Sequence, residues 1–227
     1  MDIEKNKKIL LIGASGLVGG LIAKFCEENK YHQVQINRTS LCKNSDLIEE
    51  IVTDYNDNEY LEDIPSTDHV CIASGSRLSL SQLIHIRKKD RELFRNIDLK
   101  MPVEIAKSAF LKGAKEISII SAVGADENSM NYYLKIKGIL EKEIKNIGFE
   151  KITFVRPGHL LGKRNSKVAW EVKFYEFIFM MMKPLMIGVF KKFRNVQAED
   201  VALAVVSSIE KNFDGSKILE YDDIVKK

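Results

Sequence analysis

The sequence predicts a single α/β domain over residues 1–227, built on a doubly wound parallel sheet with a small C-terminal lobe. Short apolar runs alternate with amphipathic stretches, which is typical of parallel strands connected by helices. A glycine-rich turn follows the first apolar run, and small or polar residues follow several later ones, at the edge where such sheets bind ligands. One segment, about 157–197, breaks the alternation and is expected to form the lobe.

The first apolar run, 9–12, ends in a turn with the pattern G-x-x-G-x-x-G, and apolar residues then recur at helical spacing. Such a turn presents backbone N–H groups and the positive end of a helix to an anion. It is therefore expected to bind the pyrophosphate of a dinucleotide. The alternative is a glycine-rich turn that binds nothing. The expected cofactor-binding residues of this turn are Gly13, Ala14, Ser15, Gly16, Leu17, Val18 and Gly19.

Each later element is predicted in the same way, from an apolar run or from apolar residues at helical spacing. Gly113 and Gly148 end two helices, and Glu199-Asp200 opens the last one with negative charge, which suits a helix N-terminus. The strands are expected at 9–12, 34–36, 51–53, 70–73, 117–121, 152–155 and 218–221, and the helices at 17–29, 90–112, 132–146 and 198–211.

The composition, with 45% hydrophobic and 30% charged residues, is that of a soluble globular protein. The formal net charge of +3 is too small to indicate nucleic-acid binding, and the short basic clusters are not interleaved with aromatic residues. The three cysteines, Cys26, Cys42 and Cys71, lack the spacing of a zinc site or of a disulfide framework, so no metal is expected.

The N-terminus is charged and leads straight into the first strand, without the apolar core of a signal peptide. The apolar stretch 174–190 contains Glu176 and Lys183-Pro184, which makes it a poor membrane span. We therefore expect a protein of the reduced cytoplasm without an integral membrane span.

The second strand ends in Asn37-Arg38, about 20 residues after the glycine turn, where dinucleotide-binding proteins often carry a ribose-reading acid. Asn37 can hydrogen-bond a ribose, and Arg38 offers a guanidinium to a 2′-phosphate, so NADP(H) is favoured over NAD(H). The alternative for Arg38 is a solvent-exposed residue at a strand end.

Two further segments follow strands at the same predicted edge. Asp54, after the third strand, is expected to accept from the adenine amino group or, equally, to cap the next turn. Ala73, Ser74 and Gly75, after the fourth strand, are small enough for the backbone to lie against a cofactor, although they also suit a simple tight loop.

Tyr133 and Lys137 stand four residues apart on the helix after the fifth strand, and therefore on one face of it. Ser121 ends that strand, so the three side chains are expected to converge. An ammonium beside a phenol favours the phenolate, which makes Tyr133 a usable proton donor or acceptor next to a carbonyl. Ser121 is expected to hydrogen-bond the same substrate oxygen. The alternative is an ordinary Tyr–Lys pair on a helix surface.

Four stretches of the sequence resemble the short-chain dehydrogenase/reductases. They are most similar to the atypical branch around the human Tat-interactive oxidoreductase-like protein, and the similarity covers nearly the whole chain. The stretches are G-A-S-G-L-V-G at 13–19, I-S-A-V-G-A-D at 120–126, Y-Y-L-K-I-K-G at 132–138 and F-V-R-P-G-H-L-L at 154–161.

The resemblance implies a Rossmann-type fold that binds NADP(H), with Ser121, Tyr133 and Lys137 as catalytic residues and Lys137 also on the nicotinamide ribose. It implies that the turn Arg156, Pro157, Gly158 lies beside the nicotinamide. It also makes Asn96 a match for the fourth catalytic position of the wider family.

The sequence departs from the family pattern in two places, both on the substrate side. Ala122-Val123 stands where a second serine and a basic residue are usual, and the insert 77–89 is long and charged. The stretch 170–193, rich in Phe and Met, is expected to be an apolar lid, a membrane-surface or dimer patch, or the ordinary core of the lobe. His159 either polarises a substrate carbonyl or packs within the lobe.

Two classes of function fit these features. The first is an NADP(H)-dependent oxidoreductase that transfers a hydride to or from a small, apolar carbonyl or alcohol substrate. The second is an NADP(H)-binding sensor or regulatory protein without turnover. An isomerase or epimerase on the same scaffold is a third reading, and a homodimer is compatible with all three.

Overall fold

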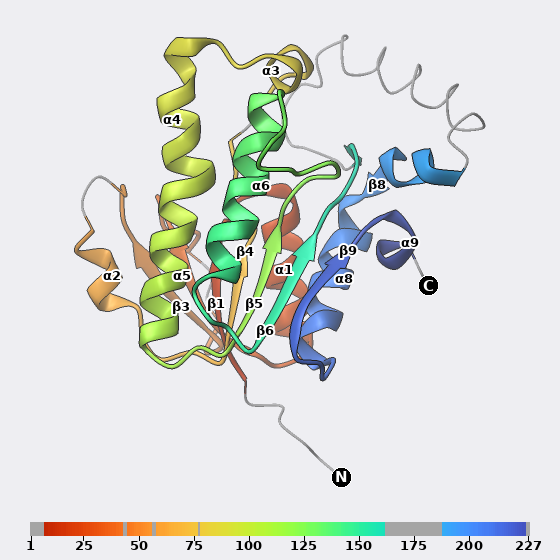
Figure 1. Ribbon diagram of the computed structural model, residues 1–227. Helices are drawn as coiled ribbons and strands as arrows, with labels where there is room; N and C mark the ends of the chain where they lie inside the picture. Colours follow the sequence, from red (N-terminus) through yellow and green to blue (C-terminus); the bar gives the residue numbers. More distant parts are fainter. Residues whose placement is uncertain (1–6, 43–44, 56–57, 77, 162–187, 226–227) are drawn as a thin grey trace.

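A parallel sheet organises the fold. The computed structural model describes residues 7–42, 45–55, 58–76, 78–161 and 188–225. Seven strands lie in the order β3-β2-β1-β4-β5-β6-β9, with every neighbouring pair parallel (Figure 1). The order reverses between β1 and β4, which is where open parallel sheets bind ligands. The strands are β1 Lys8–Ile12, β2 His32–Asn37, β3 Ile48–Val52, β4 His69–Ile72, β5 Glu116–Ile120, β6 Lys151–Val155 and β9 Gly215–Leu219.

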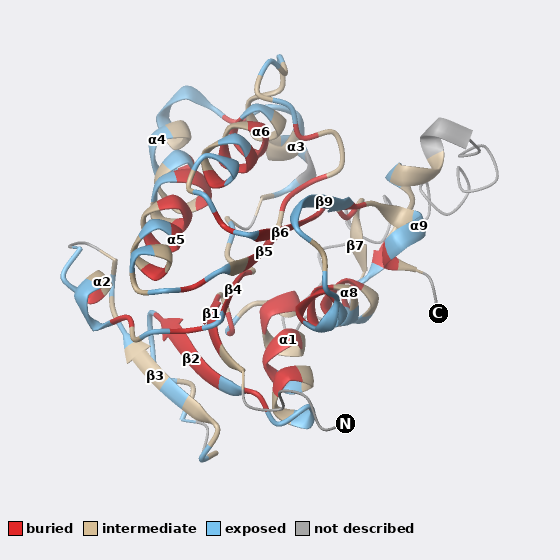
Figure 2. Cartoon of the chain, turned by 60° about the horizontal axis from the view of Figure 1, so that its bottom comes forward, coloured by how far each residue is buried: buried red, intermediate tan, exposed pale blue. Residues whose placement is uncertain are grey.

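Helices cover both faces of this sheet. α1 packs against α8 on one face, and α5 packs against α6 on the other. Figure 2 shows that the buried residues follow the strands and the inner faces of these helices. The α-helices are α1 Leu17–Glu28, α2 Tyr60–Asp63, α3 Leu80–Ile84, α4 Arg91–Arg95, α5 Met101–Leu111, α6 Tyr132–Lys145, α8 Ala198–Glu210 and α9 Tyr221–Ile224.

The sheet divides the core into two clusters. Leu10 of β1 belongs to the cluster under α5 and α6, and the next residue, Leu11, belongs to the cluster under α1 and α8. Both side chains are fully buried, as expected for a parallel sheet that is covered on both faces. Cys26 and Cys71 are buried in the second cluster, where they pack as small core residues.

The predicted strands and long helices are present, with ends displaced by up to three residues. The helix expected at 90–112 contains a π-helical turn, η2 Asn96–Lys100, between α4 and α5. The short helices α2, α3 and α9 were missed because a single turn carries no apolar periodicity.

The expected lobe at about 157–197 is described only in part. Its described elements are β7 Leu160–Leu161, the 3₁₀ helix η4 Gly188–Phe193 and β8 Val196–Gln197, and β7 pairs with β8. The stretch 162–187, with most of the Phe- and Met-rich segment, lies outside the described residues. Within the described part of the chain, we find no helix with the length and apolar character needed to cross a membrane.

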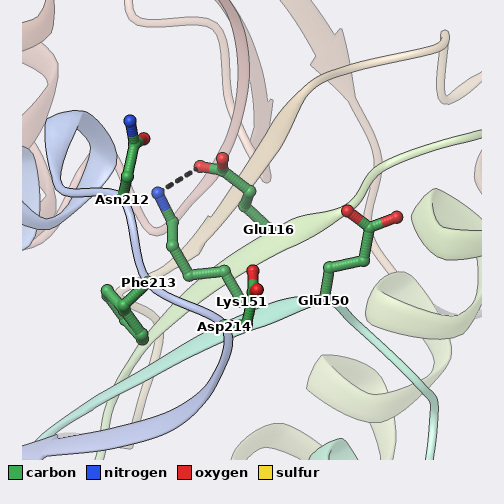
Figure 3. Close-up of a pocket in the computed structure, with 6 residues that line it drawn as sticks. All are labelled: Glu116, Glu150, Lys151, Asn212, Phe213 and Asp214. Atoms are coloured by element: carbon green, nitrogen blue, oxygen red, sulfur yellow. Dashed lines mark ion pairs between the residues drawn. The ribbon is translucent and has the colours of Figure 1, made fainter.

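A buried polar network lies at the amino ends of the strands, opposite the expected ligand edge. Glu116 of β5 accepts from His69 of β4 at 2.9 Å. Figure 3 shows its ion pair with Lys151 of β6, at 2.7 Å. Lys151 also donates to the carbonyls of Ile209 and Lys211 after α8. The network therefore fastens the end of α8 to three neighbouring strands.

The hollow beside this network, shown in Figure 3, is not a cofactor site. Its volume of about 170 Å³ is well below the roughly 300–1,000 Å³ of small-molecule sites. Burial raises the pKa of Glu116, but hydrogen bonds and charge from His69 and Lys151 outweigh burial and bring the pKa to about 2. Burial lowers the pKa of His69, more strongly than Glu116 raises it.

Glu116→Gln is expected to destabilise the fold by on the order of 3 kcal/mol, because it leaves the buried ammonium of Lys151 uncompensated. The variant should also lose less of its free energy of unfolding than the unmutated protein when the pH is lowered. Ionised Glu116 stabilises the fold above its ordinary pKa of 4.5, and this contribution is lost as pH falls toward about 2. Urea unfolding at neutral and acid pH measures both effects. Glu150→Gln is the control, since its pair with Lys115 is exposed; equal losses in the two variants would contradict the prediction.

Candidate functional site

The glycine turn joins β1 to α1 at the carboxyl end of the sheet. Gly13 has φ +93°, and its backbone lies so close to the loop after β4 that a Cβ would stand 2.7 Å from the carbonyl carbon of Ala73. A Cβ on Gly19 would stand 2.0 Å from the carbonyl oxygen of Gly13. These two glycines therefore allow the close packing of strand, turn and helix that the sequence predicted.

The N-terminus of α1 is available to an anion. Gly16 is its N-cap, no side chain caps the helix, and no acidic residue stands in its first turn. Its first N–H groups and the helix dipole therefore favour negative charge at this position. Gly16 itself has ordinary extended dihedrals, and a Cβ there would meet only the carbonyl oxygen of Gly13, at 3.1 Å.

Asn37 and Arg38 lie where β2 ends. Asn37 is buried and its Nδ2 donates to Glu50 of β3, while its Oδ1 has no partner among the described residues. Arg38 is exposed. Glu50 also accepts from Ser40 at 2.5 Å and from the backbone of Leu41 at 2.9 Å, so it holds the loop that follows Arg38.

Glu50 carries the negative charge at this end of the site. Burial raises the pKa of Glu50, but hydrogen bonds from Ser40, Leu41 and Asn37 outweigh it and hold the pKa below its usual value. The sequence analysis missed this carboxylate because it comes from β3, not from the strand end that conventionally reads the ribose.

The other predicted cofactor residues also lie at the carboxyl edge. Asp54 is exposed, just beyond β3. Ala73 and Ser74 follow β4, and the buried Oγ of Ser74 has no partner among the described residues. Gly75 faces the predicted catalytic lysine, because a Cβ there would stand 3.8 Å from Lys137 Nζ.

Tyr133 and Lys137 lie on the first turns of α6, as predicted. Lys137 is buried, and its Nζ pairs with Asp98 Oδ1 at 2.9 Å. Burial lowers the pKa of Lys137, but Asp98 and Tyr133 outweigh it and raise the pKa. Burial raises the pKa of Tyr133, and the opposing charges of Lys137 and Asp98 leave it above its ordinary value. Tyr133 is therefore a neutral phenol at physiological pH.

Asp98 is the residue that contacts Lys137, two positions after the expected match, Asn96. It lies in η2, where its Oδ2 also accepts from the backbone of Ser76 at 2.8 Å. Asn96 Oδ1 is buried without a partner among the described residues. The π-helical turn changes which side chains face α6, so helical spacing alone does not identify Asp98.

Ser121 lies just after β5, but it is bound to another side chain. Its Oγ donates to Glu141 Oε1 at 2.6 Å, and Arg156 binds Glu141 through two hydrogen bonds, at 2.8 and 2.6 Å. Because the single hydroxyl proton is used here, Ser121 offers a substrate only its lone pairs. Glu141 stands four residues after Lys137, so helical spacing was the signal that identifies it.

The turn after β6 is tightly packed. The guanidinium of Arg156 pairs with α6 through Glu141. The carbonyl of Pro157 accepts from the backbone of Val123 at 3.1 Å. A Cβ on Gly158 would stand 2.4 Å from the carbonyl oxygen of Arg194. The backbone of His159 accepts from Val196, which joins β7 to β8.

Together these residues fit a dinucleotide. The uncapped end of α1 suits a pyrophosphate, the unpartnered Oδ1 of Asn37 suits a ribose hydroxyl, and buried Lys137 suits a second ribose. All of them lie at the carboxyl edge of the strands, on both sides of the reversal between β1 and β4.

Comparison with known proteins identifies relatives along most of the chain, although no family model matches. The protein FMP52 of Kluyveromyces lactis is 32% identical over 164 residues, which is 69% of this chain and 69% of that protein. FMP52 of Candida albicans is 31% identical over 159 residues, covering 69% and 68%. The rat protein HTATIP2 is 26% identical over 166 residues, covering 71% of this chain and 66% of that protein.

Solved structures share the fold. A short-chain dehydrogenase from Streptomyces avermitilis superposes with a TM-score of 0.66 at 16% identity, covering 99% of this chain and 91% of that chain. The Bordetella bronchiseptica enzyme WbmH, solved with NAD⁺, gives a TM-score of 0.66 at 14% identity, covering 94% and 75%. The protein therefore has a Rossmann-type fold, which it shares with these two proteins.

The comparisons correct one prediction. The expected cytoplasmic location is contradicted by the FMP52 relatives, which are named as mitochondrial proteins. The prediction failed because it relied on a missing secretory signal, which does not distinguish the cytoplasm from other compartments. The chain therefore belongs to the FMP52 family, to members of which it is 31–32% identical over more than two thirds of its length.

Proposed function

We propose that the protein is an NADP(H)-dependent oxidoreductase that reduces a small carbonyl compound. The observation that carries this proposal is the group formed by Tyr133 and the buried pair Lys137 and Asp98, which lies beside the loop after β4. It combines a neutral phenol with a fixed ammonium at the edge where dinucleotides bind in this fold. Buried Phe94 packs against the ring of Tyr133 at a centroid distance of 6.0 Å and helps to fix its orientation.

In this proposal, residues of the chain bind the cofactor and donate the proton. A bound nicotinamide dinucleotide supplies the hydride to the carbonyl carbon. The α1 N-terminus holds the pyrophosphate and Lys137 holds the nicotinamide ribose. Tyr133 donates its proton to the carbonyl oxygen, so that an alcohol leaves and the phenolate regains a proton from solvent. Ser121, bound to Glu141, accepts a hydrogen bond from the hydroxyl of that alcohol.

The test is consumption of NADPH on addition of a panel of aliphatic and aromatic aldehydes and ketones. Turnover of any member, together with the matching alcohol among the products, supports the proposal. Without turnover by a protein that binds NADPH, the proposal fails and the second function below gains support.

A second function, an NADP(H)-binding sensor without turnover, is favoured by one contact. Ser121 donates its only hydroxyl proton to Glu141 and so cannot donate it to a substrate carbonyl. This contact weakens the chemistry expected of a Ser–Tyr–Lys site while leaving the cofactor residues intact.

Arg38→Ala is expected to weaken NADPH binding by about 1.5–3 kcal/mol, the size of a hydrogen bond to a charged group. That corresponds to roughly 10- to 150-fold in Kd, and NADH binding should be unchanged because NADH lacks the 2′-phosphate. Calorimetric titration of both cofactors measures this, with exposed Arg95→Ala as the control for surface charge. Tighter binding of NADH than of NADPH by the unmutated protein would overturn the preference.

A further inference from the structure

The contact between Asp98 and Lys137 joins three segments of the site. Asp98 comes from the π-helical turn, Lys137 from α6, and Ser76 from the loop after β4. Asp98 uses one carboxylate oxygen for each of its two partners, at 2.9 Å to Lys137 and 2.8 Å to Ser76. Only 2% of the Asp98 side chain and 6% of the Lys137 side chain are exposed, so solvent does not compete for this pair.

The pair changes what Lys137 does to Tyr133. An isolated ammonium would favour the phenolate, but a carboxylate in contact with it opposes that effect. Neither of two neighbouring groups, Glu141 and Phe94, takes the place of the Asp98 carboxylate. Glu141 faces Lys137 from the same helix and is itself paired with Arg156, and Phe94 packs against Tyr133 from α4 without charge.

We propose that Asp98 is a positioning residue that pins Lys137 to the loop after β4 and, by compensating its charge, keeps Tyr133 a neutral proton donor. The inference rests on the proposed function, because it assigns the Tyr133 site to carbonyl reduction rather than to alcohol oxidation. Reduction consumes a proton from the phenol, whereas oxidation begins from the phenolate. Burial is the largest cause that raises the pKa of Tyr133, and the charge of Asp98 adds to it against that of Lys137.

The test measures ionisation of Tyr133 in the protein without cofactor. Tyrosine labelled with ¹³C at Cζ gives a signal that moves when the phenol ionises, and Tyr133→Phe identifies the signal of Tyr133. Asp98→Asn keeps the shape and an acceptor oxygen but removes the charge. We expect Tyr133 to ionise about one to two pH units lower in this variant. At a pH between the two transitions, Tyr133 should be phenolate in the variant and phenol in the unmutated protein. Ionisation at the same pH in both would overturn the inference.

Two controls separate charge from structure. Glu92→Gln removes an exposed carboxylate from the adjacent α4 and should leave the Tyr133 signal unchanged. If Asp98→Asn does not fold, the double variant Asp98→Asn/Lys137→Gln leaves no buried charge without a partner. Tyr133 should then ionise at lower pH in the double variant than in Lys137→Gln alone, because only the single variant retains the carboxylate. Equal values would also overturn the inference.

Failure of this inference differs from failure of the proposed function, because the titration needs neither cofactor nor turnover. A shifted Tyr133 signal without NADPH oxidation supports the role of Asp98 and contradicts the reductase. NADPH oxidation without a shifted signal supports the reductase and contradicts the role of Asp98. When a substrate is turned over, Asp98→Asn should also lower the pH above which kcat/KM for reduction declines, by the same one to two units.

Discussion

Gly16→Val is expected to abolish dinucleotide binding while leaving the domain folded. Gly16 has φ −83° and ψ 169°, which suit any residue, and a Cβ there meets only one backbone oxygen, at 3.1 Å. A branched side chain on the N-cap of α1 would instead project into the space that a pyrophosphate must enter. The variant should therefore lose the ligand and keep most of its stability.

Thermal unfolding with and without NADPH measures this effect. At a ligand concentration 100 times Kd, binding stabilises the fold by about 2.7 kcal/mol, or roughly 5–10 °C in Tm for a protein of this size. Gly16→Val should show none of this rise. A full rise in the variant would mean that the turn is not the phosphate site.

Gly19→Ala is the matched comparison, because it should act on the stability of the fold rather than on ligand binding. A Cβ on Gly19 would stand 2.0 Å from the carbonyl oxygen of Gly13, so the helix must move away from the turn. We expect a loss of about 1–3 kcal/mol of stability without any ligand present. The two glycines of this motif therefore have different roles: Gly16 is needed for dinucleotide binding, and Gly19 is needed for stability.

The sequence predicted the fold well because its signals are local. Apolar runs identify parallel strands wherever both faces of the sheet are covered, and β1, β4, β5 and β6 are such strands. The glycine turn was equally easy to recognise, because its three glycines stand at regular spacing within one short stretch. Both signals can be read from short stretches of sequence, even though the close contact that requires Gly13 is a tertiary one, with Ala73.

The chemistry of the site was less predictable, because it depends on pairs that are distant in sequence. Asp98 reaches Lys137 across the core, through a π-helical turn that apolar periodicity does not indicate. Glu50 comes from a different strand than the residue it binds, Asn37. Ser121 lies just after β5 as expected, but its hydroxyl donates to Glu141, which stands one helical turn after Lys137 on α6 and was not predicted as its partner.

Tyr133→Phe is expected to lower turnover by roughly 10²- to 10⁴-fold, the usual contribution of a general acid, on any carbonyl compound the protein reduces. The ring and its packing against Phe94 are kept, and only the proton donor is lost. NADPH affinity should change little, because the phenol acts on the substrate oxygen. Steady-state NADPH oxidation and calorimetric binding measure the two quantities separately.

The neighbouring residue supplies the control. Tyr132 stands on the same turn of α6, but its ring stacks under Arg91, with the guanidinium 4.5 Å from its centroid, and its hydroxyl lies 3.5 Å from a backbone carbonyl. Tyr132→Phe should therefore retain most of the activity. Lys137→Ala should lose both turnover and NADPH affinity, because Lys137 is assigned to both the phenol and the ribose. An unmutated rate for Tyr133→Phe on an accepted substrate would contradict the catalytic assignment, since a phenol that donates no proton in the reaction is dispensable.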